Sequence, residues 1–366
     1  MTRRKKEKVI IVGLRLRQNR HNFDSSFAEL SGLVEAAGGE VIAELVQTRN
    51  QPTGASYIGK GKVQELQHLI EELEPDLVVF DSELSPVQQR NLEETLKIRV
   101  VDRTRLILDI FSMRARSKEG RLQVELANLQ YNLPRLTGAG KEMSRLGGGI
   151  GSRGLGEQKL ELDKRNIRKR IKELQKQLAA VEANRQNQKK QRQRAGLPII
   201  SLVGYTNAGK SSLFNRLCTS AHRSGQPQVT VNARVFQTLD TTIRKITLPS
   251  GQEILLSDSV GFIQNLPHHL VAAFRSTLDE IIEADFLLHV VDAADPNYME
   301  KMKVIEEVLD DLGADQAKVI TVFNKADKID EFFAPGCLVS ARTGEGIDEL
   351  MQHIEQCINQ PLFEFG

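Results

Sequence analysis

Short apolar runs alternate with amphipathic helical patterns through the first 110 residues. The runs VIIVG, VIAELVQ, DLVVFD and IRVVD have the length and the β-branched content of strands, and patterns such as VQELQHLIEEL lie between them. This alternation is typical of a parallel sheet that carries helices on its faces. Residues 1–110 are therefore predicted to form an α/β subdomain.

Beyond residue 110 the apolar positions follow helical spacing. Two segments each carry one stripe with steps of three and four residues: Leu122, Leu126, Leu129, Leu133 and Leu136 in the first, and Ile167, Ile171, Leu174, Leu178 and Val181 in the second. Two such stripes can bury each other when their helices pack side by side. We expect residues 111–195 to form an antiparallel helical hairpin.

The segment between the two stripes, residues 137–157, contains eight glycines together with Lys141, Arg145 and Arg153. Glycine loses more conformational freedom on ordering than any other residue, so this loop is expected to take one shape only when something binds it. Its cations favour contact with phosphates. A plain flexible connector is the alternative.

The third region, residues 196–366, begins with a strand pattern that leads into a phosphate-binding motif. LPIISLV precedes Gly204-x-x-x-x-Gly209-Lys210-Ser211, and a helical pattern follows, which is the order that a P-loop requires. Backbone N–H groups and the helix start can then bind the β-phosphate, while Lys210 can bridge the β- and γ-phosphates. The Ser211 hydroxyl is suited to Mg²⁺.

Further motifs follow other strand patterns and favour GTP over ATP. Asn324-Lys-Ala-Asp327 comes after VITVF, and the carboxylate of Asp327 can accept two hydrogen bonds from guanine that adenine does not offer. Ser340-Ala341-Arg342 is where a backbone N–H could read guanine O6. In ILLSDSVGF, Asp258 can hold Mg²⁺ through water, and the Gly261 N–H can meet the γ-phosphate.

Composition and charge favour a polyanionic partner, and they give no sign of disulfides, a zinc site or a membrane span. The net charge is +2, yet residues 1–200 carry 37 basic against 25 acidic residues, so the front half would attract a polyanion such as nucleic acid. The three cysteines are far apart, which indicates neither disulfides nor a zinc site. No apolar stretch reaches the roughly 20 residues of a membrane span. We expect a cytoplasmic protein.

Taken together, these segments resemble the HflX family of translational GTPases over nearly the whole chain. The resemblance is carried by GYTNAGKSSLFN, FQTLDTTIR, DSVGF, NKAD and SAR, together with YIGKGK and GGGIGSRGLGE in the front half. It implies a Ras-like P-loop GTPase domain at 196–366, preceded by the α/β subdomain and the hairpin. It also implies binding to the large ribosomal subunit and the splitting of stalled ribosomes under stress.

Carried onto this sequence, the resemblance assigns further residues. Phe236–Asp240 would be switch I, and Thr238 would be the second protein ligand of Mg²⁺ besides Ser211. The family usually has proline where this chain has Thr241, which leaves the switch I backbone less defined. Many relatives have an extra C-terminal domain, which we expect to be absent because the chain ends soon after the helix that begins near Gly346. The front domain and the glycine-rich loop would reach rRNA through Lys141, Arg145 and Arg153, and the protein is expected to be a monomer.

The complete set of expected GTP contacts follows from these motifs. It comprises Gly204, Tyr205, Thr206, Asn207, Ala208, Gly209, Lys210, Ser211, Phe236, Gln237, Thr238, Leu239, Asp240, Asp258, Ser259, Val260, Gly261, Asn324, Lys325, Ala326, Asp327, Ser340, Ala341 and Arg342.

Hydrolysis is expected to depend on Lys210, Gly261 and Asn207. Many GTPases orient the attacking water with a Gln after the DxxG glycine, but this chain has Phe262 there. Intrinsic turnover should therefore be slow, and a partner could accelerate it. Asn207 lies where some GTPases without that Gln bind a monovalent cation, so K⁺ is a hypothesis for a second ion. The alternative is that Asn207 only packs the P-loop.

Two other functions are compatible with the same residues. The first is a GTP-controlled RNA-binding module that acts on non-ribosomal RNA through the basic front half. The second is an enzyme whose front domain performs its own chemistry, but that segment shows no Cys/His dyad, metal cluster or dinucleotide fingerprint.

Overall fold

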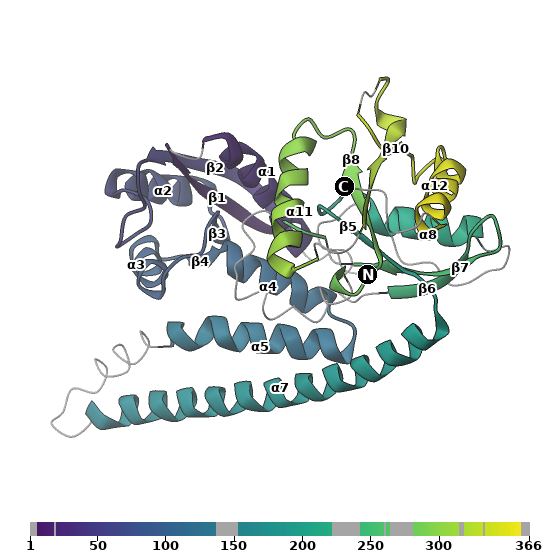
Figure 1. The fold of residues 1–366 in the computed structure, drawn as a ribbon. Helices are drawn as coiled ribbons and strands as arrows, with labels where there is room; N and C mark the ends of the chain where they lie inside the picture. The colour runs from purple at the N-terminus through teal and green to yellow at the C-terminus, as the bar shows by residue number, and fades with distance from the viewer. Residues whose placement is uncertain are drawn as a thin grey trace. The chain divides into compact units, whose positions relative to one another are not determined.

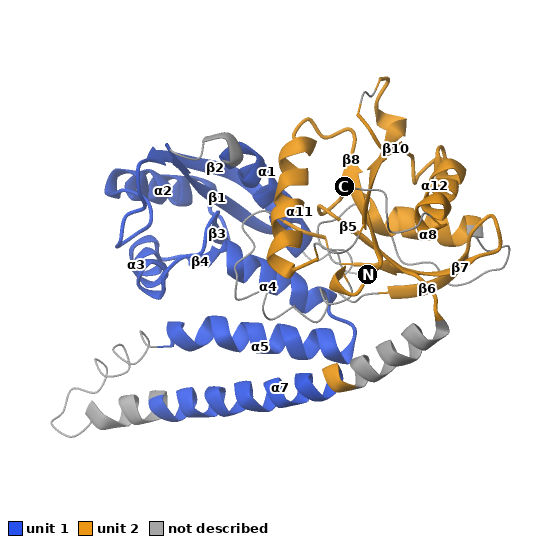
Figure 2. Cartoon of the chain, in the orientation of Figure 1, with its two compact units in different colours: residues 1–181, 265–273 blue, residues 182–264, 274–366 orange. Residues whose placement is uncertain are grey.

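The protein is described by a computed structural model that covers residues 6–17, 20–136, 153–221, 242–259, 261–263, 281–314, 318–331 and 334–359. The chain forms two compact units (Figure 2). The first unit consists of Met1–Val181 with Asn265–Ala273, and the second of Glu182–Gln264 with Phe274–Gly366. Along the chain, the first unit gives way to the second between Val181 and Glu182, inside the helix that spans Arg153–Ala195. The sequence predicts the start of the GTP-binding region at the end of this helix, between residues 195 and 196, and this domain boundary stays a prediction.

The first unit contains the predicted α/β subdomain, built on a four-stranded parallel sheet with the order β2-β1-β3-β4 (Figure 1). Its elements are β1 (Glu7–Leu16), α1 (Arg20–Ala37), β2 (Gly39–Arg49), α2 (Lys60–Leu73), β3 (Leu77–Phe80), α3 (Pro86–Leu96), β4 (Arg99–Asp102) and α4 (Arg103–Arg114). The middle strands β1 and β3 read as continuous apolar runs because both faces of the sheet are covered by helices.

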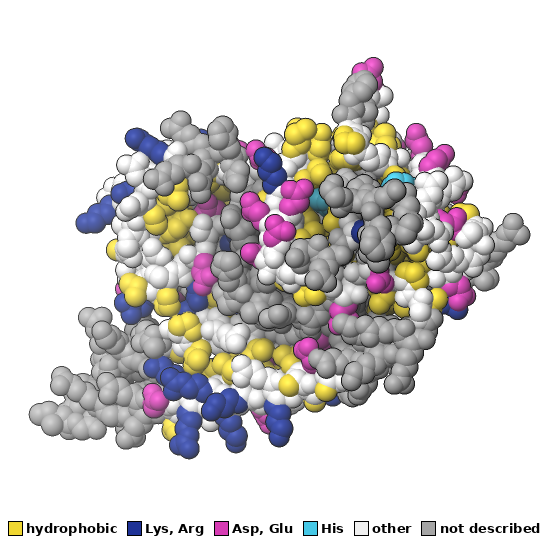
Figure 3. All heavy atoms as spheres, in the orientation of Figure 1, with side chains coloured by type: hydrophobic (Ala, Val, Ile, Leu, Met, Phe, Trp, Pro, Cys, Tyr) yellow, Lys and Arg dark blue, Asp and Glu magenta, His cyan; other side chains and the backbone are white. Residues whose placement is uncertain are grey.

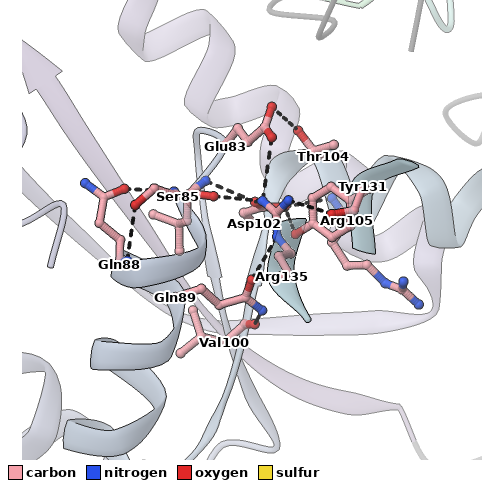
Figure 4. A network of polar contacts seen from close by, with 11 residues as sticks. Glu83, Ser85, Gln88, Gln89, Val100, Asp102, Thr104, Arg105, Tyr131 and Arg135 are labelled. Carbon is pink, nitrogen blue, oxygen red and sulfur yellow. Dashed lines mark hydrogen bonds and ion pairs between the residues drawn. The ribbon is translucent and has the colours of Figure 1, made fainter. Parts of the chain in front are cut away.

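A buried carboxylate joins this sheet to the next helix, α5 (Lys118–Arg135) (Figure 4). Asp102 ends β4 and caps α4, since its Oδ1 accepts a hydrogen bond from the Arg105 backbone N–H at 2.8 Å. From α5, the Tyr131 hydroxyl donates to the same oxygen at 2.9 Å, and Arg135 pairs with Oδ2 at 3.1 Å. Burial raises the pKa of Asp102, and these partners oppose that rise. The network therefore holds α5 to the sheet at a position where a carboxylate without partners would be costly.

The second half of the hairpin is α7 (Arg153–Ala195), which lies beside α5 in Figures 1 and 2. The predicted stripes meet: Leu174 is fully buried with Leu122 and Leu126, and Leu129, Ile171 and Leu178 pack against them. Arg170 of α7 also forms an ion pair with Glu125 of α5 at 2.8 Å.

The glycine-rich segment differs from the prediction at its end. The helix α7 begins at Arg153, so residues 153–157 are helical where the glycine content predicted a loop. Lys141 and Arg145 lie outside the described residues, as does the side chain of Arg153.

The second unit contains a six-stranded sheet with the order β10-β9-β8-β5-β7-β6, parallel except for β6, which runs antiparallel to β7. Its elements are β5 (Ile199–Gly204), α8 (Lys210–Ala221), β6 (Thr242–Thr247), β7 (Glu253–Asp258), β8 (Phe286–Asp292), α11 (Tyr298–Leu312), β9 (Lys318–Asn324), a 3₁₀ turn (Ala326–Lys328), β10 (Cys337–Leu338) and α12 (Ile347–Asn359). This is a mostly parallel α/β architecture, as the sequence predicts for the third region. Among the described helices of both units, none has the length and apolarity needed to cross a membrane.

Candidate nucleotide-binding site

The P-loop joins the end of β5 to the start of α8, and two of its glycines are required by close contacts. Gly204 has φ +149°, and a Cβ there would lie 2.3 Å from the Val290 carbonyl oxygen. Gly209 has φ +93°, and a Cβ would lie 2.2 Å from Nδ2 of Asn324. Between them, Asn207 adopts a left-handed conformation with φ 63°. The loop therefore takes a backbone path that side chains at either glycine would block.

Lys210 folds back over this loop. Its Nζ donates hydrogen bonds to the carbonyl oxygens of Gly204 at 3.0 Å and Tyr205 at 2.9 Å. Burial lowers the pKa of Lys210 to about 8, although the negative charge of Asp258 opposes this shift. Burial, with a smaller effect from Lys210, also lowers the pKa of the neighbouring His289 to about 4, so its imidazole is neutral near pH 7. Lys210 thus places a positive charge against the loop, in surroundings that strengthen its attraction for phosphate.

A hydroxyl and a carboxylate come together beside Lys210. The Ser211 hydroxyl donates to Oδ2 of Asp258 at 2.7 Å, because β7 pairs with β5 and ends at the same edge of the sheet. Ser259, the next residue, donates its hydroxyl to the Leu202 carbonyl oxygen and so ties the end of β7 to β5. Hard oxygen donors of this kind suit Mg²⁺, so Ser211 and Asp258 fit the ion that the P-loop motif implies.

The segment after Asp258 pairs with the P-loop backbone. The Phe262 N–H donates to Gly204 at 3.1 Å, and the Thr206 N–H donates to the Phe262 carbonyl oxygen at 2.8 Å. A Cβ at Gly261 would lie 2.9 Å from Nζ of Lys210, so the absence of a side chain lets this backbone approach the lysine. Since the side chain of Phe262 is buried and apolar, it cannot orient a water molecule as a glutamine would.

Asn324, at the end of β9, links the P-loop to the base-recognition loop. Its side chain is buried, its Nδ2 donates to the Ala208 carbonyl oxygen at 2.9 Å, and its Oδ1 accepts from the Ala341 N–H at 3.0 Å. Residues more than a hundred positions apart in sequence are held together through this one amide. The neighbouring Lys325 has φ 72° and pairs with Asp292 at the end of β8.

Asp327 lies in the turn after Asn324 and is bound by both polar side chains of the SAR triplet. Oδ1 accepts from the Ser340 hydroxyl at 2.6 Å, and Oδ2 pairs with Arg342 at 2.7 Å. The hydrogen bond from Ser340 and the charge of Arg342 lower the pKa of Asp327, so it is a carboxylate at neutral pH. An anionic carboxylate is the form needed to accept two N–H donors from guanine.

The predicted motifs therefore lie together at the carboxyl ends of the parallel strands of the six-stranded sheet. They are the P-loop, Asp258, Asn324–Asp327 and Ser340–Arg342. The expected contacts Phe236, Gln237, Thr238, Leu239, Asp240 and Val260 lie outside the described residues. Three residues near the site were not predicted: Asp292, the partner of Lys325; His289 of β8, which lies opposite Val203 of β5; and Arg216 of α8, which donates to the carbonyl oxygens of Ala341 and Arg342. Of these three, only Asp292 could have been suggested by the sequence, because a carboxylate that directly follows an apolar strand pattern lies at the end of the sheet where the other motifs lie.

Comparison with known proteins decides the family. Profiles described as "GTP-binding GTPase N-terminal", "GTP-binding GTPase Middle Region" and "50S ribosome-binding GTPase" match residues 24–112, 114–192 and 199–325. The chain is 48% identical to the GTPase HflX of Caldanaerobacter subterraneus subsp. tengcongensis, over 96% of this chain and 81% of the relative. The chain belongs to the HflX family of GTPases.

Other comparisons agree with this assignment. The GTPase HflX of Escherichia coli (strain K12) is 40% identical over 96% of this chain and 82% of that protein. The crystal structure of SsGBP in complex with GDP superposes with a TM-score of 0.53 and 25% identity, covering 96% of this chain and 98% of that one. The predicted family, the binding of guanine nucleotide and the GTPase activity of this HflX family member are thereby confirmed. Mg²⁺ is the ion that such GTPases use.

Proposed function

We propose that this GTPase binds the large ribosomal subunit in its GTP form, dissociates stalled or idle ribosomes into subunits under stress, and is released when GTP is hydrolysed to GDP and phosphate. The observation that carries the proposal is the match of residues 199–325 to a profile described as a 50S ribosome-binding GTPase. The same observation does not favour a module for non-ribosomal RNA. A ribosomal partner places the protein in the cytoplasm, where we expect it to act as a monomer.

The surface charge of the first unit supports an RNA partner. Basic side chains gather along the lower edge of the face drawn in Figure 3. The exposed basic residues of α7 include Arg165, Arg168, Lys169, Lys172 and Lys176. The side chain of Arg168 is 58% exposed, and its partner Glu161, at 3.6 Å, is 67% exposed, so this surface ion pair is weak enough for a phosphate backbone to compete with it. We further propose that Lys141, Arg145 and Arg153 contact rRNA directly.

The geometry of the second unit supports a role for each motif in GTP binding. Lys210, which is held over the loop by two carbonyl oxygens, exchanges these partners for the β- and γ-phosphates. Ser211 and Thr238 would hold Mg²⁺ directly and Asp258 would hold it through water, and the ion would neutralise phosphate charge. The Gly261 N–H meets the γ-phosphate, and Asp327 reads guanine N1–H and the 2-amino group. Switch I and the segment after Asp258 both contact the γ-phosphate and relax after hydrolysis, so their conformation communicates the GTP state to the rest of the chain.

The hydrolysis step needs help, because Phe262 is buried and apolar at the position of the usual glutamine. We propose that the ribosome orients the attacking water in place of the glutamine. We also propose that K⁺, held by Asn207, offsets the charge that develops in the transition state. Asn207 has a left-handed backbone, a conformation that asparagine tolerates better than most residues, which also fits the alternative that it only packs the P-loop. Turnover should be several-fold faster in KCl than in NaCl, and equal rates would exclude K⁺.

Sedimentation of whole ribosomes with the full-length protein tests the main proposal. With a non-hydrolysable GTP analogue, the protein should migrate with the large subunit and the fraction of intact ribosomes should fall, whereas GDP should give neither result. Association should weaken steeply with salt, and neutralising Lys141, Arg145 and Arg153 together should reduce that slope. Binding to free RNA in preference to large subunits would contradict the proposal.

A further inference from the structure

The two carboxylate oxygens of Asp327 have partners of opposite character. Oδ1 is bound by the hydroxyl of Ser340, which is fully buried. Oδ2 is bound by the guanidinium of Arg342, whose side chain is 74% exposed while that of Asp327 is 8% exposed. One oxygen is therefore fixed from inside the protein. The other is held from the solvent side by a group that can leave.

The backbone of this turn is anchored independently of the Arg342 side chain. Arg216 of α8 donates to the carbonyl oxygen of Ala341 at 3.1 Å and to that of Arg342. The Thr343 N–H also donates to Oγ of Ser340 at 3.1 Å. The Arg342 side chain can thus swing away from Asp327 while the turn, and the N–H of Ala341 bonded to Asn324, keep their positions.

A base that approaches Asp327 must therefore compete with Arg342. Guanine offers two parallel N–H donors to a carboxylate, so it can occupy both oxygens and displace the guanidinium. Hypoxanthine lacks the 2-amino group and offers only N1–H. In that case Arg342 can keep its oxygen, and the loss of the second donor from the base is partly compensated.

We propose that Arg342 is a specificity-determining residue that occupies one oxygen of Asp327 until guanine displaces it. The pair weakens GDP binding, because it must be broken, and it lessens the penalty for a base without the 2-amino group. Because the guanidinium of this ion pair is exposed to solvent, the pair is worth little, up to about five-fold in an equilibrium constant. This inference rests on the proposed contact between Asp327 and guanine.

Calorimetric titration of the full-length protein with GDP and with inosine diphosphate, both with Mg²⁺, tests the inference. In Arg342→Ala, GDP should bind more tightly and inosine diphosphate more weakly, so that the ratio of the two affinities rises about two- to five-fold. Lys303→Ala is the matched control, because it removes one positive charge from an exposed position on α11 of the same unit. It should leave the ratio unchanged.

Two results separate a failure of this inference from a failure of the base contact. Asp327→Asn should lose its preference for GDP and gain xanthosine diphosphate, whose base presents an acceptor at position 2. If it does so and the ratio in Arg342→Ala stays constant or falls, Arg342 is not a competitor, although Asp327 still reads the base. If Asp327→Asn keeps the selectivity of the native protein, the assignment of Asp327 itself is overturned.

Discussion

Replacing Gly209 with alanine should damage the nucleotide site through a contact that lies outside the P-loop. The new Cβ would lie 2.2 Å from Nδ2 of Asn324, so the asparagine has to move. Its two hydrogen bonds, to Ala208 and Ala341, would then be lost or distorted. The two bonds contribute about 0.5–1.5 kcal/mol each, about 1–3 kcal/mol together. Because they hold the P-loop and the base-recognition loop in the shape expected to bind GDP, losing that shape should raise the Kd of GDP by up to the same free energy, roughly 5- to 150-fold.

The backbone strain of the substitution can be measured separately. Gly251, in the turn between β6 and β7, has φ +91°, almost the same as φ +93° at Gly209, but a Cβ there would have no heavy atom within 4 Å. Gly251→Ala should therefore lower the free energy of unfolding only by the cost of placing alanine in a left-handed conformation, about 1–2 kcal/mol. It should leave the affinity for GDP intact. Urea denaturation gives the first quantity, and calorimetric titration gives the second.

A double-mutant cycle identifies the contact responsible. In an Asn324→Ala background the atom that the new Cβ would strike is gone, so Gly209→Ala should cost much less GDP affinity than it does in the native protein. Equal losses in the two backgrounds, or a Gly209→Ala variant that binds GDP within about two-fold of the native protein, would refute the reasoning.

Three further outcomes are expected. Burial lowers the pKa of Lys210 from 10.5 to about 8, so between these values the unfolded chain binds more protons and the free energy of unfolding rises with pH. Lys210→Met should lack this contribution, which urea denaturation at pH 7.5 and 9.5 would detect as a smaller rise than in the native protein. Tyr131→Phe removes a hydroxyl donor from buried Asp102 and should cost about 1–3 kcal/mol of stability; a loss under about 0.5 kcal/mol would contradict the network. Leu174→Ala in the hairpin should cost about 2–5 kcal/mol, whereas Leu162→Ala, at a side chain 58% exposed on the same helix, should stay within about 0.5 kcal/mol; similar losses would contradict the packing.

The elements and motifs of this protein could be predicted because their signals are local. The apolar runs of the first strands, the leucine stripes of α5 and α7 and the glycines of the P-loop each lie within a short window. Their periodicity follows directly from strand and helix geometry. The start of α7 at Arg153 could not be placed in this way. A high glycine content predicts a flexible backbone, but it does not show at which residue the chain nevertheless becomes helical.

The amino-acid pattern alone was enough to predict an α/β subdomain, a helical hairpin and a GTPase domain, and to assign Asp327 as the carboxylate expected to read guanine. The side chains that bind Asp327, Ser340 and Arg342, could be identified as its partners only from the folded structure. Arg216 meets Ala341, Asn324 meets Ala208, and Asp102 meets Tyr131 across long stretches of chain. The physical reason is that these hydrogen bonds depend on how strands and helices pack in space, and spacing along the chain carries no record of that packing.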